Sequence, residues 1–464
     1  MTDRPLSLVP LDRARTLHLL GIGGSGMAPL ATALLDMGHE VSGTDLVESE
    51  AIDALRARGA TVHIGHDGSN VPRGADAVVV STAVPADNIE VSAAHSAGIA
   101  VVHRTEVLVR MAQLRRTIAI AGTHGKTTTT AMLAEVFVHA GLDPSYLVGG
   151  RLGGDAGGAR WGSGDVFVVE ADESDGSGFA IPHAIGVVTN VEPDHLEHHG
   201  TFARLSAAFA GFLDASGEAA WVCIDDAGAA ALTTTSAVHS WGLDPRADVR
   251  AVDVRSDRWS SSFGVVIDGV DHGRVELPLP GLHNVRNAVG ALALAHHLGV
   301  APTVAADALA RFSGVARRFE RRGSANGVEF VDDYAHLPTE VAAAVAAARA
   351  GGWERVVVVH QPHRYSRTEA LAAGFADAFV DADLIVVTDV YAAGERPRPG
   401  VTGAAVVDGV RAAHPDAEVV YVADRDALAR SVAELLRAGD LCLSVGAGDV
   451  THLADEIRAL PGWS

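Results

Sequence analysis

The chain has 464 residues, of which 48% are apolar, and this length suggests about three domains of ordinary size. Its formal net charge of −22 repels nucleic acid and anionic membranes, so we expect neither as a partner, and an anionic substrate needs a local cluster of positive groups. Only two cysteines occur, no apolar run is long enough to span a membrane, and residues 1–10 lack the pattern of a signal peptide, so we expect a cytoplasmic protein.

The first segment, residues 1–113, alternates apolar strand-like runs with helical spacing. Strands that alternate with helices are typical of a parallel sheet with crossover helices, so we expect a Rossmann-like domain. The predicted strands lie at 16–20, 40–43, 77–80 and 99–102, with a helix at 27–37 after the first of them.

A glycine-rich turn, Gly21-Ile-Gly-Gly-Ser-Gly26, follows the first strand, and Asp45 comes about twenty residues later. This is the fingerprint of nicotinamide dinucleotide binding. The physical requirement, however, is only a diphosphate at the helix N-terminus and a ribose within reach of the aspartate. A nucleotide-diphosphate sugar satisfies both conditions, so the turn alone leaves the two ligands open.

The second segment, residues 114–316, opens with a strand at 117–120 and the loop Ala121-Gly-Thr-His-Gly-Lys-Thr-Thr-Thr-Thr130. Small residues let backbone amides converge on phosphate oxygens, Lys126 would contact the β- and γ-phosphates, and the Thr127 hydroxyl would bind Mg²⁺. The strict P-loop pattern is not met, because Ile120 stands where its first glycine belongs. Further strands are predicted at 165–170 and 185–190, and residues 245–280 suggest a small antiparallel patch.

The basic residues of the chain are distributed in an informative way. Among 36 basic residues, Lys126 is the only lysine, and it falls inside the predicted phosphate loop. A compact ammonium on a flexible stem suits phosphate binding there, and the planar fork of arginine is a poor substitute.

Acidic groups follow the next two predicted strands, in Glu170-Ala-Asp-Glu-Ser-Asp175 and in Asn190-Val-Glu-Pro-Asp-His195. Because Mg²⁺ prefers oxygen ligands, these clusters predict a site for two cations that bridge ATP and a second anionic substrate. Glu170, at the end of its strand, is a candidate ligand, and His195 is expected to be functional beside these acidic residues, whereas His198 and His199 are expected in a solvated turn.

The third segment, residues 317–464, again alternates strands with helices, which predicts a second Rossmann-like domain. Its run His360-Gln-Pro-His-Arg-Tyr-Ser-Arg367 concentrates positive charge in an acidic protein, and Arg364 with Arg367 would fork onto a carboxylate or phosphate. A polar turn, Asp332 to Glu340, follows another short strand. The remaining predicted elements are strands at 355–359, 384–388, 418–422 and 441–445 and a helix at 341–350.

Taken in order, these motifs resemble the Mur ligase family, the amino-acid-adding enzymes of peptidoglycan synthesis, over essentially the whole chain. The resemblance implies three domains, namely a UDP-sugar-binding domain at 1–113, a central ATPase at 114–316 and a C-terminal domain at 317–464 that closes over the amino acid. It extends beyond the two phosphate turns and the two acidic clusters to Leu282-His-Asn-Val-Arg-Asn287, Asp332-Asp-Tyr-Ala-His336, Gln361-Pro-His-Arg-Tyr-Ser-Arg-Thr368 and Asp389-Val-Tyr-Ala-Ala-Gly-Glu395.

Within this family the motifs look most like those of the ligase for the first amino acid, which couples L-alanine to the lactyl carboxylate of UDP-N-acetylmuramate. The resemblance implies that ATP forms an acyl phosphate, that Mg²⁺ assists, and that the enzyme is a monomer or a weak homodimer. The implied UDP-sugar residues are Gly21, Gly23, Gly24, Ser25, Gly26 and Asp45. The implied ATP and metal residues are Gly122, Thr123, His124, Gly125, Lys126, Thr127, Thr128, Glu170, His195, His283, Asn284, Asn287 and Asp332. The implied residues around the lactyl carboxylate and alanine are Tyr334, His336, His363, Arg364 and Arg367.

Two departures from the family pattern stand out. Leu337 replaces a histidine that commonly follows the position of His336, and the single lysine excludes the carbamylated lysine that sibling ligases use for a second cation. Three other functions remain open at this point. These are a ligase that attaches a preformed peptide to the same UDP-sugar, a nicotinamide-dependent oxidoreductase and a nucleotide-binding regulator without turnover.

Overall fold

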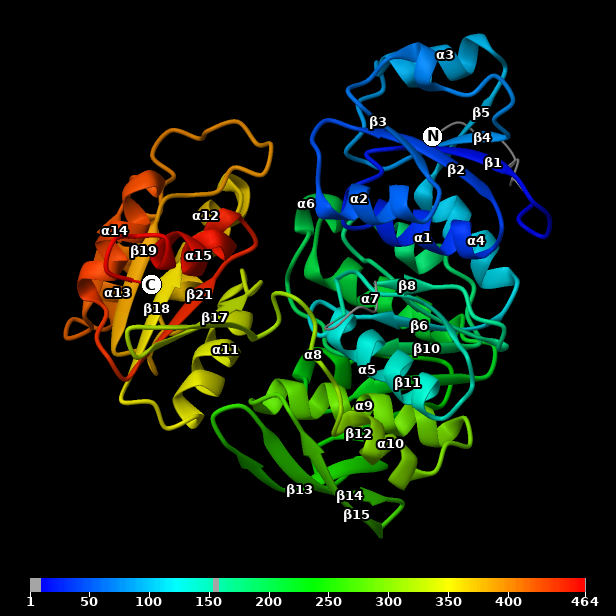
Figure 1. Ribbon diagram of the computed structural model, residues 1–464. Coiled ribbons are helices and arrows are strands. Elements are labelled where there is room, and N and C mark those ends of the chain that lie inside the picture. Colours follow the sequence, from blue (N-terminus) through cyan, green and yellow to red (C-terminus); the bar gives the residue numbers. More distant parts are fainter. Residues whose placement is uncertain (1–9, 153–157, 464) are drawn as a thin grey trace. The chain divides into compact units, whose positions relative to one another are not determined.

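The computed structural model describes residues 10–152 and 158–463, which form three sheets (Figure 1). The chain divides into two compact units. The first comprises residues 1–250, 265–273 and 286–309, and the second comprises 251–264, 274–285 and 310–464. The predicted α/β architecture with three sheet domains is confirmed. The predicted domain boundaries stay a prediction.

The N-terminal sheet has five parallel strands in the order β3-β2-β1-β4-β5. A sheet of this kind needs crossover helices, and four helices with one short 3₁₀ turn connect and follow its strands. The strands are β1 (Thr16–Leu20), β2 (Glu40–Asp45), β3 (Thr61–Ile64), β4 (Ala77–Val80) and β5 (Ala100–His103). The helices are α1 (Met27–Asp36), α2 (Glu50–Ala57), α3 (Ile89–Ser96) and α4 (Arg104–Gln113), with η1 (Gly68–Asn70).

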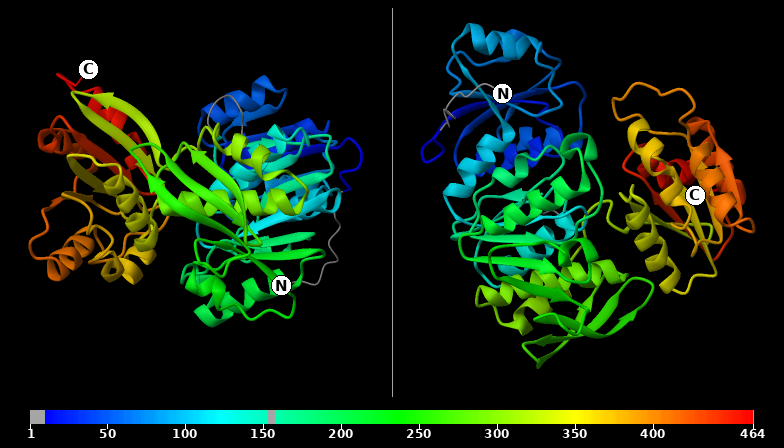
Figure 2. Two further views of the ribbon diagram at one scale, coloured as in Figure 1. Left: turned by 90° about the horizontal axis from the view of Figure 1, so that it is seen from below. Right: turned by 180° about the vertical axis from the view of Figure 1, so that it is seen from behind.

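The central sheet has ten strands in the order β15-β14-β13-β12-β11-β10-β6-β9-β7-β8, and its core strands β6, β9, β10, β11 and β12 pair in parallel. Residues 245–280 were expected to form a small antiparallel patch. The strands β13, β14 and β15 of this region extend the central sheet, which β13 joins by pairing in parallel with β12 (Figures 1 and 2). The strands are β6 (Arg116–Ala121), β7 (Ser145–Leu147), β8 (Ala159–Arg160), β9 (Val166–Glu170), β10 (Ile185–Val188), β11 (Ala219–Cys223), β12 (Val238–Gly242), β13 (Val249–Ser256), β14 (Ser261–Ile267) and β15 (Val270–Leu277). The helices are α5 (Lys126–His139), α6 (Leu196–His199), α7 (Phe202–Asp214), α8 (Ala227–Ala230), α9 (Leu282–His297) and α10 (Pro302–Leu309), with η2 (Ser177–Ala180).

The C-terminal sheet has six strands in the order β16-β17-β21-β18-β19-β20, all parallel except the β16–β17 pair. Its strands at 355–360 and 384–388 contain unbroken apolar runs, as expected for strands covered on both faces. The strands are β16 (Glu320–Ala325), β17 (Val328–Asp333), β18 (Arg355–His360), β19 (Leu384–Thr388), β20 (Val419–Val422) and β21 (Asp440–Val445). The helices are α11 (Pro338–Ala350), α12 (Tyr365–Leu371), α13 (Ala404–Ala413), α14 (Arg425–Leu435) and α15 (Leu453–Arg458), with η3 (Ala372–Phe375) and η4 (Asp449–His452).

Packing joins the N-terminal and central sheets of the first unit. One apolar core runs from α1 and α4 of the N-terminal sheet to Phe167, Phe209 and Phe212 of the central domain. The C-terminal sheet has a separate core on each of its faces. The two phosphate turns of the first unit are therefore built on one continuous packed body.

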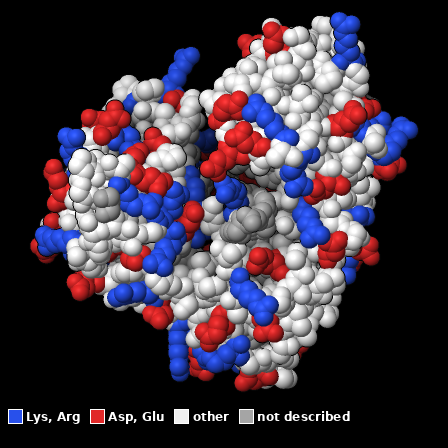
Figure 3. Space-filling model, in the orientation of Figure 1, with Lys and Arg blue, Asp and Glu red and all other residues white. Residues whose placement is uncertain are grey.

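Neither cysteine forms a disulfide, and both are buried. Acidic and basic side chains are interspersed over the face drawn in Figure 3. None of the helices within 10–152 and 158–463 combines the length and the apolar composition that crossing a bilayer requires.

Candidate functional site

The phosphate loop lies between β6 and α5, at the carboxyl end of the central sheet. Gly122 and Gly125 adopt φ values of +136° and +77°, which disfavour any side chain. Space is limiting as well, since a Cβ on Gly122 would overlap the Thr189 hydroxyl and one on Gly125 would lie 2.6 Å from Oδ1 of Asn287. The conformation and packing of this loop therefore require glycine at both positions.

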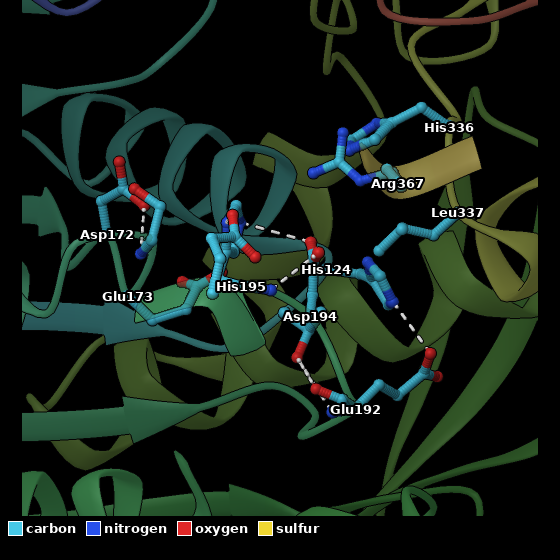
Figure 4. A network of polar contacts seen from close by, with 12 residues as sticks. His124, Asp172, Glu173, Glu192, Asp194, His195, His336, Leu337 and Arg367 are labelled. Atoms are coloured by element: carbon cyan, nitrogen blue, oxygen red, sulfur yellow. Dashed lines mark hydrogen bonds and ion pairs between the residues drawn. The ribbon is translucent and has the colours of Figure 1, made fainter. Parts of the chain in front are cut away.

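The segment after β10 holds the loop in place. Asn190 Oδ1 accepts from the His124 amide at 2.7 Å, and Asn190 Nδ2 donates to the His124 carbonyl at 2.9 Å. The Thr189 hydroxyl also donates to that carbonyl, at 2.5 Å. Figure 4 shows the His124 ring beside Glu192, with Nε2 3.1 Å from the carboxylate. Thr189, Asn190 and Glu192 were missed as individual site residues, although the quoted motif contained two of them.

Lys126 begins α5 and folds back over its own loop. Its Nζ donates to the Gly122 carbonyl at 2.5 Å and lies 2.7 and 2.9 Å from the two carboxylate oxygens of Glu173. Burial disfavours the ammonium, but the carboxylates of Glu173 and Asp172 outweigh that effect and hold the pKa of Lys126 above its ordinary value. The lysine is therefore charged, and its charge is directed at the loop.

Oxygen ligands suitable for Mg²⁺ meet beside the loop. The Thr127 hydroxyl donates to Glu170 Oε2 at 3.0 Å, and Glu170 Oε1 accepts from the Gly149 amide at 2.5 Å. A hydroxyl and a carboxylate fit the preference of this cation. Within the described ranges, however, no three His, Cys, Asp or Glu side chains are gathered as a ready-made metal site. The metal assignment of Thr127, Glu170 and His195 stays a prediction.

His195 precedes α6 with a φ of +52°, an unusual conformation for a residue with a side chain. Its Nε2 lies 3.2 Å from Asp194 and its Nδ1 lies 3.6 Å from Glu197, and Figure 4 shows it next to Asp194. The expectation for His199 was wrong. This residue is half-buried rather than solvated, because its Nε2 bonds the Glu173 carbonyl at 2.8 Å and its ring packs on Phe179.

The glycine-rich turn of the N-terminal domain connects β1 to α1. Gly21 has a φ of +67°, and the Gly23 amide donates to Asp45 Oδ2 at 2.8 Å. The other Asp45 oxygen accepts from the Leu46 amide at 2.7 Å. Asp45 therefore braces the turn, in addition to lying where a ribose is predicted. Gly24, Ser25 and Gly26 complete the turn in front of α1, and the structure places all six predicted residues together.

In the second unit, aromatic and basic side chains gather after β17 and β18. The His363 ring stacks on Tyr391 at 5.8 Å between centroids and contacts His336 edge-on at 5.8 Å. His336 also meets Tyr334 edge-on at 5.4 Å, and Arg367 Nη1 lies 3.1 Å from His363 Nδ1. Four of the five residues predicted around the carboxylate and alanine are thus joined by contacts. The fifth, Arg364, precedes α12 with a φ of +68°.

Charge at this cluster favours an anion. Burial, together with the positive groups His336, Arg367, Arg364 and Arg317, lowers the pKa of His363 to about 3. A neutral His363 accepts from Arg367 through Nδ1, so the arginine keeps its full positive charge. Arg317, which was not predicted, stacks its guanidinium over Tyr334 at 4.8 Å.

The remaining predicted residues are largely buried. Asp332 is fully buried, where it accepts from Arg317 at 3.3 Å, Ser444 at 3.1 Å and Thr451 at 2.6 Å. Its carboxylate therefore positions Arg317 and the loop after β21. His283, Asn284 and Asn287 all lie on α9, and Asn284 donates to the Pro280 carbonyl at 2.8 Å. Thr123 and Thr128 are buried in and behind the phosphate loop.

Comparisons with known proteins match this arrangement along the chain. Family models match at 16–116 (Mur ligase family, catalytic domain), at 120–295 (Mur ligase middle domain) and at 317–448 (Mur ligase, glutamate ligase domain). The chain belongs to the Mur ligase family.

Relatives within the Mur ligases are similar over nearly the full length. A protein of Kineococcus radiotolerans named UDP-N-acetylmuramate–L-alanine ligase is 49% identical over 97% of this chain and 96% of its own. One of the same name from Mycolicibacterium gilvum is 44% identical over 99% of both chains. The crystal structure of the UDP-N-acetylmuramate-alanine ligase of Thermotoga maritima matches with a TM-score of 0.80 and 28% identity, over 96% of this chain and 98% of that one.

Proposed function

We propose that this Mur ligase joins L-alanine to the lactyl carboxylate of UDP-N-acetylmuramate, with conversion of ATP to ADP and phosphate. Full-length similarity to proteins named for this reaction carries the proposal. Two features of the chain support it independently, namely the only lysine placed in a phosphate loop and the cationic cluster of the second unit. Family membership also removes the oxidoreductase alternative.

The reaction has two steps. A carboxylate oxygen of the UDP-sugar attacks the γ-phosphorus, and the bond to the ADP oxygen breaks, which gives an acyl phosphate. The amine of L-alanine then attacks the acyl carbon, the bond to phosphate breaks and one amine proton is lost. Phosphoryl transfer depends mainly on positioning and on neutralising charge, and loss of phosphate makes amide formation favourable.

Each group has a place in this scheme. The loop amides and Lys126 would hold the ATP phosphates, and Thr127, Glu170 and His195 would hold Mg²⁺. The bound ion would neutralise charge on the transferred phosphoryl group. Arg364 and Arg367 would bind a carboxylate, and His336 and Tyr334 would line the alanine site. His283, Asn284 and Asn287 would lie on the adenine side. We also propose two Mg²⁺ ions, a cytoplasmic location and a monomer or weak homodimer.

The test is phosphate release from ATP with Mg²⁺ and UDP-N-acetylmuramate, with and without L-alanine. Release that needs both the sugar and L-alanine supports the proposal. Release with a tripeptide but not with L-alanine would assign the chain to the peptide-attaching ligases. The absence of phosphate release with either acceptor would contradict any ligase assignment.

A further inference from the structure

An arginine outside every motif quoted above lies against the glycine-rich turn. Arg104 is the first residue of α4, which is capped by His103 and Glu106. Its guanidinium packs on Gly26 so closely that a Cβ on that glycine would overlap Nη1. Because β5 and β1 belong to one parallel sheet, the carboxyl end of β5 brings Arg104 to the same edge as the turn.

The electrostatics of this contact are unfavourable without an anion. Gly26 is the N-cap of α1 and has no side chain to bond the first amides, and the first turn of α1 has no acidic residue. The positive end of the α1 dipole therefore faces the positive guanidinium. Within residues 10–152 and 158–463, the amides of Ser25 and Gly26 meet no protein acceptor. The amides of Ser25 and Gly26 and the guanidinium of Arg104 therefore lie together at the N-terminus of α1.

One carboxylate partly balances Arg104. Asp172 Oδ2 lies 3.4 Å from Nη2, beyond the usual 2.7–2.9 Å of a strong charge-assisted hydrogen bond, and both side chains remain partly exposed. The next residue, Glu173, holds Lys126 of the ATP loop. Adjacent carboxylates thus contact the cations of both phosphate turns.

We propose that Arg104 is a substrate-binding residue that binds the diphosphate of the UDP-sugar at the turn formed by Gly21–Gly26. The guanidinium supplies charge that the backbone amides lack, and Asp172 occupies it only while no diphosphate is bound. This inference rests on the proposed function for the identity of the ligand. Its chemistry requires only a nucleoside diphosphate.

The test is calorimetric titration of the full chain with UDP and with uridine, in the presence of saturating ADP to fill the ATP loop. We expect Arg104→Gln to weaken UDP binding by about 10- to 100-fold and to leave uridine binding within about twofold. The matched control is Arg58→Gln, because Arg58 pairs with Asp36 at the opposite end of α1. This control should bind UDP as the unaltered chain does.

The variant Asp172→Asn distinguishes a direct contact between Arg104 and the ligand from a purely structural ion pair between Arg104 and Asp172. If Arg104 binds the diphosphate, removal of the competing carboxylate leaves UDP affinity equal or higher. Equal losses in Arg104→Gln and Asp172→Asn would overturn the proposal, as would UDP affinity unchanged in Arg104→Gln. Phosphate release by the unaltered chain is scored separately, so a failure of the ligase assignment remains distinguishable from a failure of the Arg104 assignment.

Discussion

Glu173 and Lys126 form a buried ion pair in which both carboxylate oxygens lie within 2.9 Å of the ammonium. Nucleotide phosphates would have to take the place of this carboxylate at Nζ. The pair therefore maintains the charge of the lysine and also competes with its ligand.

Replacement of Glu173 by Gln should release this competition. Because Gln keeps the shape but loses the charge, we expect ADP without Mg²⁺ to bind about tenfold more tightly to Glu173→Gln. Calorimetric titration with ADP measures the effect, and Glu218→Gln, at an exposed pair with Arg116, is the control. Weaker ADP binding would show instead that Glu173 supports the nucleotide site.

Replacement of Lys126 by Arg tests the phosphate-loop assignment. A planar fork cannot reproduce the compact ammonium that bonds the Gly122 carbonyl, so the phosphate-release rate should fall at least about 100-fold. The thermal midpoint should stay within a few degrees of that of the unaltered chain. Retention of most of the activity would refute the role of Lys126.

Much of the fold follows from local pattern. The strands at 16–20, 77–80 and 384–388 match β1, β4 and β19, because each is a short apolar run bounded by polar or turn residues. The extension of the central sheet by β13–β15 and the antiparallel β16–β17 pair were not predicted. Both depend on which strand edge is free after the core has assembled, and that is a tertiary property.

Some residues of the site could be predicted from the sequence and others could not, because only some of them belong to continuous motifs. Gly21–Gly26 and the Lys126 loop are continuous in sequence, so their spacing alone identifies them. Arg104 begins α4, Arg317 lies in the loop before β16, and neither belongs to a motif, so the sequence offers no means to select these two among 35 arginines. The burial of Asp332 could likewise not be predicted, because its partners Ser444 and Thr451 come more than a hundred residues later in the sequence.

Loss of the Glu170 charge should alter the metal requirement. Glu170→Gln keeps the hydrogen bond from Thr127 but supplies a weaker cation ligand, so half-maximal phosphate release should need at least about tenfold more Mg²⁺. A titration of activity against Mg²⁺ checks this, with Glu135→Gln on α5 as the control. An unchanged Mg²⁺ requirement would remove Glu170 from the metal site.

Replacement of Arg367 by Lys should affect one substrate. Lys cannot both bond His363 and fork onto a carboxylate, so we expect KM for L-alanine to rise about tenfold while KM for ATP stays within about twofold. Steady-state kinetics with each substrate varied in turn measure the split. The exposed Arg398, paired with Glu369, supplies the control Arg398→Lys, and an equal rise in both constants would argue against a substrate contact.

His360 should make the C-terminal sheet sensitive to acid. Burial lowers the pKa of this ring to about 3, so it stays neutral in the fold while the unfolded chain binds a proton below about pH 6.5. Stability is therefore lost as pH falls, by about 2 kcal/mol between pH 7 and pH 5. In His360→Phe, which keeps the contacts with Phe375 and Phe379, this loss should disappear.

Hydrogen exchange of the slowest amides in β18 and β21 at both pH values measures that difference. The exposed His63, changed to Gln, should leave the pH dependence of these amides unaltered. An equal acid sensitivity in His360→Phe and the unaltered chain would show that other groups dominate.

Because Lys126 is the only lysine in the sequence, cleavage by a lysine-specific protease reports on the conformation around this one residue. A lysine-specific protease has one possible cleavage point in this chain, the peptide bond between Lys126 and Thr127, at the first turn of α5. That bond is cut only when the helix start opens. The rate at which fragments 1–126 and 127–464 appear would therefore measure how often the nucleotide loop opens, without any label or mutation.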